Sequence, residues 1–267
     1  MRRACIAILP LALLLLPVSF PVSAQIASTA PGPAPAAPGP LSRYRFHLNA
    51  VRVATGDPQL RWDADLGGDL DLYDYRAGRI TFLANYEAIL GDERRAFDPV
   101  QGNYTLDLSA SHRTRHGEIS GVFHHLSRHL SDREKPEPVD WNMIGVRFVR
   151  PYARGRVAAT MAGHALFTVQ RSSVDYDAEY GAEARADYRV DARRAAFAAA
   201  TLHTFNTDGS IAGRGWQNGG RVEGGFRFAG GAAALELVAA LERRVDDHPI
   251  RRGNATWLFA GFRLLHP

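Results

Sequence analysis

The sequence predicts an all-β fold, a closed antiparallel transmembrane β-barrel of about 12 strands. After residue 24, no stretch approaches the roughly 20 apolar residues that a membrane-spanning helix needs. Polar and apolar residues instead alternate with a period of two, which is typical of β-strands. The segments able to form strands number about 12. An even number is usual for barrels whose two chain ends lie in the periplasm.

The chain begins with a predicted signal peptide over residues 1–24. Arg2 and Arg3 form a positive first region, and an apolar run of residues 6–16 follows. Residues 22–24, Val-Ser-Ala, are typical of a cleavage site for a secreted protein. The apolar run is short for a membrane anchor and is interrupted by Pro10 and Pro17, so we expect cleavage and export.

The rest of the chain divides into a Pro/Ala-rich periplasmic linker, residues 25–41, and a barrel domain, residues 42–267. Cys5 is the only cysteine and lies in the signal peptide, so we expect neither a disulfide nor a lipid anchor in the mature protein. Loss of Arg2 and Arg3 lowers the formal net charge from +4 to +2, which excludes a nucleic-acid partner.

The first four predicted strands cover residues 43–53, 62–73, 79–90 and 104–111. The second shows the alternation most clearly: one face carries Trp62, Ala64, Leu66, Gly68, Leu70 and Leu72, and the other carries Asp63, Asp65, Gly67, Asp69, Asp71 and Tyr73. Four carboxylates opposite an apolar face are expected where lipid lies outside and a polar lumen lies inside. A soluble barrel would show the same alternation with the faces reversed. The density of charge on one face favours the membrane barrel.

The remaining predicted strands cover residues 118–130, 141–150, 156–169, 179–193, 195–205, 216–228, 232–244 and 255–265. Two of them have helical features: 195–202 is rich in alanine, and 234–241 has an apolar stripe at helical spacing. We predict strands in both places, because omitting one would leave unpaired strand edges in lipid. The last strand ends in Phe262-Arg263-Leu264-Leu265 and resembles the insertion signal of outer-membrane barrels.

The first functional hypothesis is an outer-membrane barrel without enzymatic activity, either structural or a small pore. About 12 strands enclose a narrow lumen. Charged side chains of both signs would meet there and obstruct it: Asp63, Asp65, Asp69, Asp71, Arg147, Glu183, Arg185, Arg189, Arg221, Glu223 and Arg227. We expect outer-membrane lipids and the barrel-assembly machinery as partners, and the oligomeric state does not follow from the sequence.

The second hypothesis concerns the outer end of the fifth predicted strand. His125 and Ser127 share a face with apolar Phe123, so we expect them to meet lipid. Asn142 lies on the apolar face of the next strand. Two registers, with either Ser127 or His125 opposite Asn142, keep all of these side chains on the lipid-facing side of the sheet. His125 and His129 would be about 13 Å apart, too far to share a metal ion.

These three residues supply the parts of a serine hydrolase. Ser127 would be the nucleophile and His125 the general base, while Asn142 would orient the imidazole. The His-x-Ser motif with a following Asn resembles outer-membrane phospholipase A, a family of twelve-stranded barrels with a serine hydrolase site. That resemblance implies an acyl hydrolase acting on phospholipid or lipid A. Asp132 and Asp140 beside the site leave room for a calcium ion.

The resemblance has departures and alternatives. The family commonly has Asn after its serine, where this chain has Arg128, and its loop before the Asn is shorter. The lipid A deacylase barrels also carry His-x-Ser, with an acidic partner that has no clear counterpart here. Residues 125–134 are similar to a His-x-Ser-x-His-Leu-Gly-Asp-Glu motif of an uncharacterised outer-membrane family, which implies location alone.

Overall fold

The computed structural model describes residues 38–134, 137–211 and 213–266. The predicted signal peptide, and the predicted linker up to residue 37, lie outside these residues. All 12 predicted segments form strands: β1 (Gly39–Val53), β2 (Trp62–Asp74), β3 (Arg79–Gly91), β4 (Asp98–Thr114), β5 (Gly117–Leu130), β6 (Val139–Arg154), β7 (Val157–Ser172), β8 (Tyr176–Arg189), β9 (Arg194–Thr207), β10 (Gln217–Ala229), β11 (Ala234–Val245) and β12 (Asn254–His266). The first strand begins at Gly39, three residues before the expected start of the barrel domain. In the described residues, no helix is long and apolar enough to cross a membrane.

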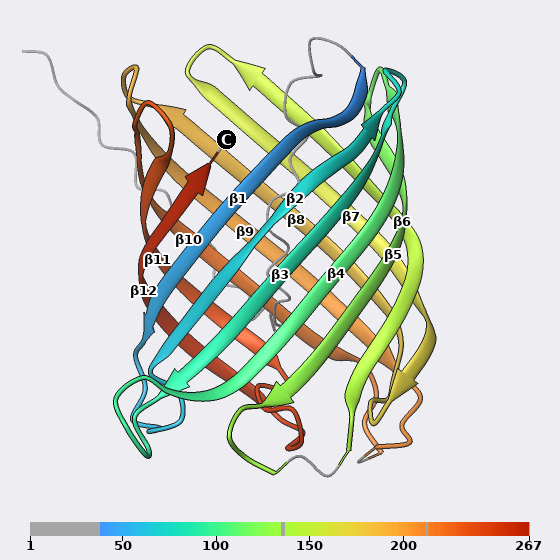
Figure 1. The fold of residues 1–267 in the computed structure, drawn as a ribbon, viewed down its shortest axis with the longest axis vertical. Coiled ribbons are helices and arrows are strands. Elements are labelled where there is room, and N and C mark those ends of the chain that lie inside the picture. The colour runs from blue at the N-terminus through green and yellow to red at the C-terminus, as the bar shows by residue number, and fades with distance from the viewer. Residues whose placement is uncertain (1–37, 135–136, 212, 267) are drawn as a thin grey trace, which may run out of the picture.

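The strands form one closed antiparallel barrel in which each strand pairs with its neighbours in the chain (Figure 1). Closure comes from β1 and β12, whose pairing runs from Phe46 opposite His266 to Val53 opposite Phe259. The two segments with helical features lie in β9 and β11, and each pairs on both sides along its length. Backbone pairing in the closed sheet therefore overrides their local preference.

The connections at the two ends of the barrel differ in length. At one end, the upper end in Figure 1, the strands are joined by short turns: 75–78, 115–116, 155–156, 190–193 and 230–233. Loops at the other end cover 54–61, 92–97, 131–138, 173–175, 208–216 and 246–253, and most of them are longer. Outer-membrane barrels have short periplasmic turns and longer extracellular loops, so we assign the upper end to the periplasm.

The two faces of the sheet are as the sequence predicts. Leu66 is 47% exposed on the outer wall, while Asp63, Asp65, Asp69 and Asp71 on the opposite face of β2 are buried toward the lumen. The outer wall also exposes large apolar side chains on the other strands, including Leu108, Ile144, Val146, Met161, Val222, Leu237 and Leu258. An apolar exterior around a charged interior is the arrangement of a barrel that spans the outer membrane.

Charged side chains pair across the lumen, as expected. Glu236 of β11 is fully buried and binds Arg185 at 2.7 Å and Arg263 at 2.9 Å, and it also accepts a hydrogen bond from Arg227 at 2.8 Å. These arginines come from β8, β10 and β12, so one carboxylate connects three other strands. Arg189 is an exception to the prediction: it lies exposed at the periplasmic end and donates to the carbonyl of Gly155 at 3.3 Å.

Part of the interior is apolar, which the sequence reasoning missed. One cluster lies at the extracellular end and contains Val122, Val139, Trp141, Met143, Leu166, Val174, Tyr176, Phe205 and Val245. A second reaches from that end toward the middle and contains Val51, Val53, Leu60, Ile89, Phe197, Val238, Ala240, Trp257 and Phe259. The inward face is therefore polar in the periplasmic part of the lumen and largely apolar near the extracellular loops.

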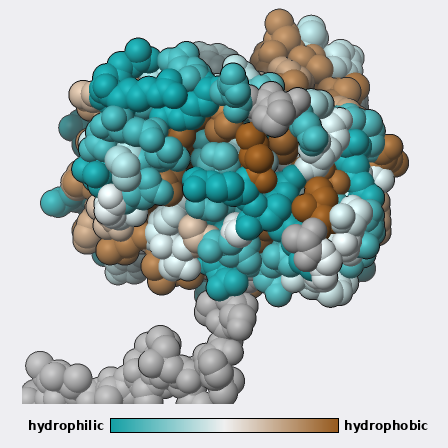
Figure 2. Space-filling view, turned by 90° about the horizontal axis from the view of Figure 1, so that it is seen from below, coloured by the Kyte–Doolittle hydropathy of each residue, from teal (hydrophilic) through white to brown (hydrophobic). Residues whose placement is uncertain are grey.

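Hydrogen bonds connect three extracellular loops next to the first cluster. Asp246 is fully buried and accepts hydrogen bonds from the hydroxyl of Tyr176 and from Arg214 at 2.7 and 2.8 Å. Arg214 also binds Asp175 at 2.6 and 2.9 Å. These contacts connect the loops between β7 and β8, β9 and β10, and β11 and β12. Figure 2 shows this end, which is covered mainly by hydrophilic residues.

His248, in the loop between β11 and β12, makes the stability of this end depend on pH. Its Nδ1 accepts the backbone N–H groups of Ile250 and Arg251, both at 3.2 Å, so it must be unprotonated. Burial, followed by the positive charges of Arg251 and Arg128, lowers the pKa of His248 to about 4. In the unfolded chain a histidine has a pKa of about 6.5.

We therefore expect the folded barrel to lose stability as the pH falls from about 6.5 toward 4, because only the unfolded state binds the proton in this range. Thermal unfolding followed by gel mobility at several pH values measures this. His248→Asn should flatten the profile in that window, whereas His116→Asn, in an exposed periplasmic turn, should leave it unchanged. If the stability of the wild type and of His248→Asn changed with pH in the same way, His248 would not be the group responsible.

Candidate functional site

The candidate site lies on the outer wall, near the extracellular ends of β5 and β6. The register places His125 opposite Asn142 and Ser127 opposite Asp140. Of the two registers that the sequence allowed, the structure therefore has the one with His125 beside Asn142. Ile119 and Phe123, on the same face of β5, are 46% and 42% exposed, so this face meets the apolar part of the bilayer.

His125 and Asn142 are joined by a hydrogen bond of 2.7 Å between Nδ1 and Oδ1. The amide oxygen can only accept, so Nδ1 of His125 carries the proton and Nε2 has a free lone pair. An imidazole in this tautomer can accept a proton at Nε2. The pair therefore has the arrangement that a general base and its orienting partner require.

A third strand fixes the direction of this hydrogen bond. Nδ2 of Asn142 donates to Oε1 of Gln170 on β7, and Nε2 of Gln170 donates to the carboxylate of Asp140 at 3.2 Å. A carboxylate accepts and does not donate, so it sets the orientation of the Gln170 amide. That amide in turn sets the orientation of Asn142. The chain of donors thus holds His125 in the tautomer that leaves Nε2 free.

Gln170 was not found from the sequence because a β-bulge brings it to the outer face. Met143 pairs with Thr168 and Asn142 pairs with Gln170, so β7 has one more residue than β6 between these pairs. An extra residue shifts the alternation of side chains by one position. Strict alternation would have placed Gln170 on the lumen side. The sequence offers only a weak signal for this position, a glutamine directly after an apolar, outward-facing segment.

Ser127 lies on the same face as His125, two residues along the strand, but their side chains are not hydrogen-bonded in the described residues. The Oγ of Ser127 is instead 3.3 Å from Nε2 of His129. The ring of His129 packs edge-on against Tyr104, with centroids 5.5 Å apart. The structure therefore brings two of the three predicted site residues together and leaves the serine beside a second histidine.

Arg128, which departs from the family pattern, points away from this site. Its side chain is buried in the lumen, 7% exposed, and donates to the carbonyl of Asp246. It therefore helps to hold the extracellular loops. Ser131 lies beyond the end of β5, where its N–H donates to the carbonyl of Val100 at 3.0 Å.

The two carboxylates suggested as calcium ligands have separate partners. Asp132 pairs with Arg95 at 2.9 Å, and Asp140 accepts from Gln170. In the part of the chain that the structure describes, three carboxylates come close enough to share an ion only at Asp63, Asp65 and Glu87, inside the lumen. There Arg244 binds Asp63 at 3.0 Å and Glu87 at 2.8 Å. Asp132 and Asp140 do not belong to this group.

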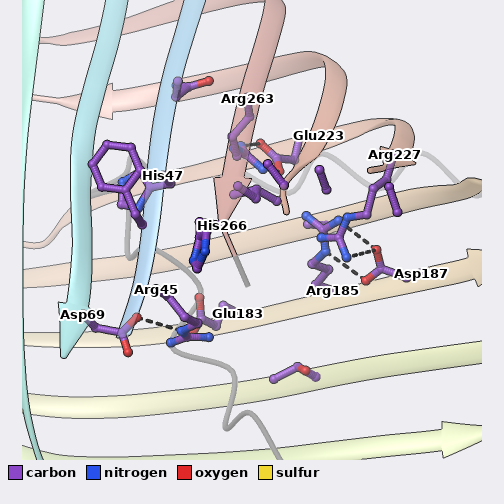
Figure 3. A pocket seen from close by; sticks show the side chains of 18 of the residues that line it. Arg45, His47, Asp69, Glu183, Arg185, Asp187, Glu223, Arg227, Arg263 and His266 are labelled. Carbon is purple, nitrogen blue, oxygen red and sulfur yellow. Dashed lines mark hydrogen bonds and ion pairs between the residues drawn. The ribbon is translucent and has the colours of Figure 1, made fainter. Parts of the chain in front are cut away.

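The lumen has a cavity of about 540 Å³ toward its periplasmic end (Figure 3). Its charged wall residues are largely paired: Arg45 binds Asp69 at 2.8 Å, and Arg185 binds Asp187 at 2.8 Å. Glu183 also lines the cavity, and it makes no hydrogen bond or ion pair with a described residue. The cavity lies on the opposite side of the barrel wall from the candidate site and is not part of it.

Comparison with known proteins agrees with this architecture. No protein-family profile and no curated protein matches the chain. Among solved structures, the chain is similar to the Salmonella typhi outer membrane phospholipase dimer with bound calcium, with a TM-score of 0.51, 10% identity, and coverage of 86% of this chain and 93% of that one. For the outer membrane phospholipase A of Escherichia coli the TM-score is 0.51, the identity 10% and the coverage 85% and 98%.

An active-site variant of the same Escherichia coli enzyme, with alanine in place of asparagine, has a TM-score of 0.50 at 11% identity and covers 85% of this chain and 91% of that one. At such low identity a likeness concerns the fold alone. The chain thus has the fold of a twelve-stranded outer-membrane β-barrel.

Proposed function

We propose that this barrel hydrolyses acyl esters of lipids in the outer leaflet, with Ser127 as nucleophile, His125 as general base and Asn142 as its orienting partner. The observation that carries the proposal is the hydrogen bond between His125 and Asn142 on the lipid-facing wall, at the level of the outer leaflet. Polar groups on that wall are costly, so their presence there calls for a role.

The reaction would follow the usual course of acyl transfer. The Oγ of Ser127 attacks the ester carbonyl carbon while its proton passes to Nε2 of His125. The bond between the carbonyl carbon and the alcohol oxygen then breaks, and His125 returns the proton to the leaving alcohol. Water releases the fatty acid from Ser127 in the second half, with His125 again as base.

Ser127 must turn toward His125 for this step. Residues two apart on a strand are about 6.7 Å apart along its axis, and both histidines flank the serine on one face. Rotation about the Cα–Cβ bond of Ser127 changes which histidine its hydroxyl approaches. Short or well-aligned catalytic hydrogen bonds often form only in the complex with substrate, so the contact with His129 is compatible with this role.

The proposal is supported by two further observations. The solved variant of the Escherichia coli phospholipase identifies an asparagine as part of that enzyme's active site, and Asn142 is the candidate for the same role here. The two apolar clusters and the paired charges inside the barrel favour a function on the wall over a wide pore. A structural barrel or a small pore is the alternative.

The test measures fatty acid release from phospholipid and from lipid A in mixed micelles by the refolded full chain. The assay is run with and without calcium, because the similar Salmonella protein was solved with calcium bound. A fluorophosphonate should label Ser127, and Ser127→Ala should lose both labelling and release. Ser131→Ala is the matched control and should keep both. No release from the unmutated protein in any condition would leave the structural hypothesis, and a conductance across planar bilayers would favour the pore.

A further inference from the structure

The periplasmic end of the barrel carries a group of arginines without acidic partners. We call this group the basic rim: Arg76, Arg115, Arg150, Arg154, Arg156, Arg189 and Arg193. All seven are exposed, in or next to the turns between β2 and β3, β4 and β5, β6 and β7, and β8 and β9. In the ranges that the structure describes, none of them pairs with a carboxylate. Asp74 and Asp191, the aspartates in or next to these turns, are already occupied, Asp74 by Arg113 and Asp191 by Arg194.

The extracellular end is different, because most of its arginines have an acidic partner. Six of them pair with carboxylates of the loops or strand ends: Arg61, Arg95, Arg133, Arg171, Arg214 and Arg252. Charge is therefore balanced locally at one end and left in excess at the other. An uncompensated set of cations repels itself unless anions gather around it.

The centre of the basic rim lies on the outward side of the barrel wall. The outward side of β6 carries Phe148, Arg150, Tyr152 and Arg154 in alternation, and all four are exposed. Arg150 lies beside Met161 and Arg154 beside Val157, on the outward side of β7. Figure 1 shows the hairpin of β6 and β7 reaching the upper end of the barrel. These two arginines thus lie where the apolar wall ends.

We propose that the basic rim binds the anionic phosphate headgroups of lipids in the periplasmic leaflet, with Arg150, Arg154 and Arg156 at its centre. A guanidinium donates two parallel hydrogen bonds to a phosphate. Tyr152 lies between the two wall arginines, at the level where aromatic side chains meet headgroups. An acidic periplasmic protein would approach the end of the barrel, whereas Arg150 and Arg154 project from its side.

This inference does not depend on the hydrolase proposal. It is tested by binding of phosphatidylglycerol and of phosphatidylethanolamine, with the same acyl chains, to the folded full chain in non-ionic detergent, measured by native mass spectrometry. We expect at least a tenfold preference for phosphatidylglycerol, because each arginine near an anionic surface contributes roughly fivefold. The preference should weaken as salt is raised.

The variant Arg150→Gln/Arg154→Gln/Arg156→Gln should reduce the preference to twofold or less. The matched control, Arg94→Gln/Arg95→Gln/Arg251→Gln, removes the same charge from exposed extracellular loops and should keep it. Gel mobility verifies that both variants fold. The proposal is overturned if the wild type shows no preference, if the rim variant keeps it, or if both variants lose it equally. Binding of polyglutamate without a preference for phosphatidylglycerol would also overturn it, in favour of an acidic protein partner.

Discussion

His125→Ala is expected to reduce the release of fatty acid by a factor on the order of 10⁶, because it removes the base without which the serine hydroxyl is a weak nucleophile. The barrel should fold normally, since His125 lies on the outer wall and, among the described residues, its side chain is hydrogen-bonded to Asn142 alone. The measurement is the turnover of phospholipid in mixed micelles by variants whose gel mobility equals that of the wild type.

Asn142→Ala should be milder, with a loss of roughly 10² to 10⁴, because it removes an orienting acceptor and no reacting atom. Asn142→Asp should recover much of the activity, since a carboxylate also accepts the proton of Nδ1. Gln170→Ala should act through Asn142 and lower the turnover number without changing the affinity for micelles. A structural role for Gln170 would instead change the melting temperature.

His129→Ala is the decisive control, because the hydroxyl of Ser127 lies beside His129 in the structure. We expect this variant to keep most of its activity. An inactive His129→Ala with an active His125→Ala would transfer the role of base to His129. In that case the hydrogen bond between His125 and Asn142 would have no catalytic meaning.

Glu236→Ala is expected to cost about 3–5 kcal/mol of folding stability, the usual effect of removing one partner from a buried ion pair. Without this carboxylate, Arg185, Arg227 and Arg263 lose their shared acceptor in the lumen. The melting temperature, followed by the change of gel mobility on heating, should fall strongly. Glu236→Gln keeps the side-chain volume and an acceptor oxygen, so it should lower the melting temperature less.

The matched control is Glu93→Ala, which breaks an exposed pair with Arg133 of 2.7 Å in the extracellular loops. Exposed pairs contribute little because water and salt screen them, so this variant should melt close to the wild type. Equal melting temperatures for the Glu236 and Glu93 variants would mean that water in the lumen replaces the lost carboxylate. Buried ion pairs would then not hold the barrel interior.

Local alternation was sufficient to predict the strands and their faces, because a wall between lipid and lumen imposes opposite polarity on neighbouring residues. It even held for the alanine-rich segment of β9, whose pairing partners outweigh its helical preference. The register of β5 and β6 could be narrowed to two choices from the faces alone. Which of the two is adopted depends on the whole pair of strands and could not be read from His125, Ser127 and Asn142.

Two features could not be predicted from the sequence, and each has a physical reason. The bulge at Val169 depends on how β7 fits β6, so the sequence alone did not place Gln170 on the outer face. The apolar clusters contradict the expectation of a polar lumen throughout. Large side chains such as Trp141 and Phe259 are buried there because a twelve-stranded barrel is narrow enough for its own side chains to fill.

The pairing of β1 with β12 sets the order in which this molecule can be built. Every other pair joins neighbours in the chain, whereas Val53 meets Phe259 across 206 positions. Until that seam forms, two strand edges present unpaired N–H and C=O groups, each of which costs several kcal/mol in hydrocarbon. An open, partly formed sheet is therefore unstable in the bilayer. Insertion and closure must be one event, and a chain lacking residues 254–266 should aggregate and not span with eleven strands.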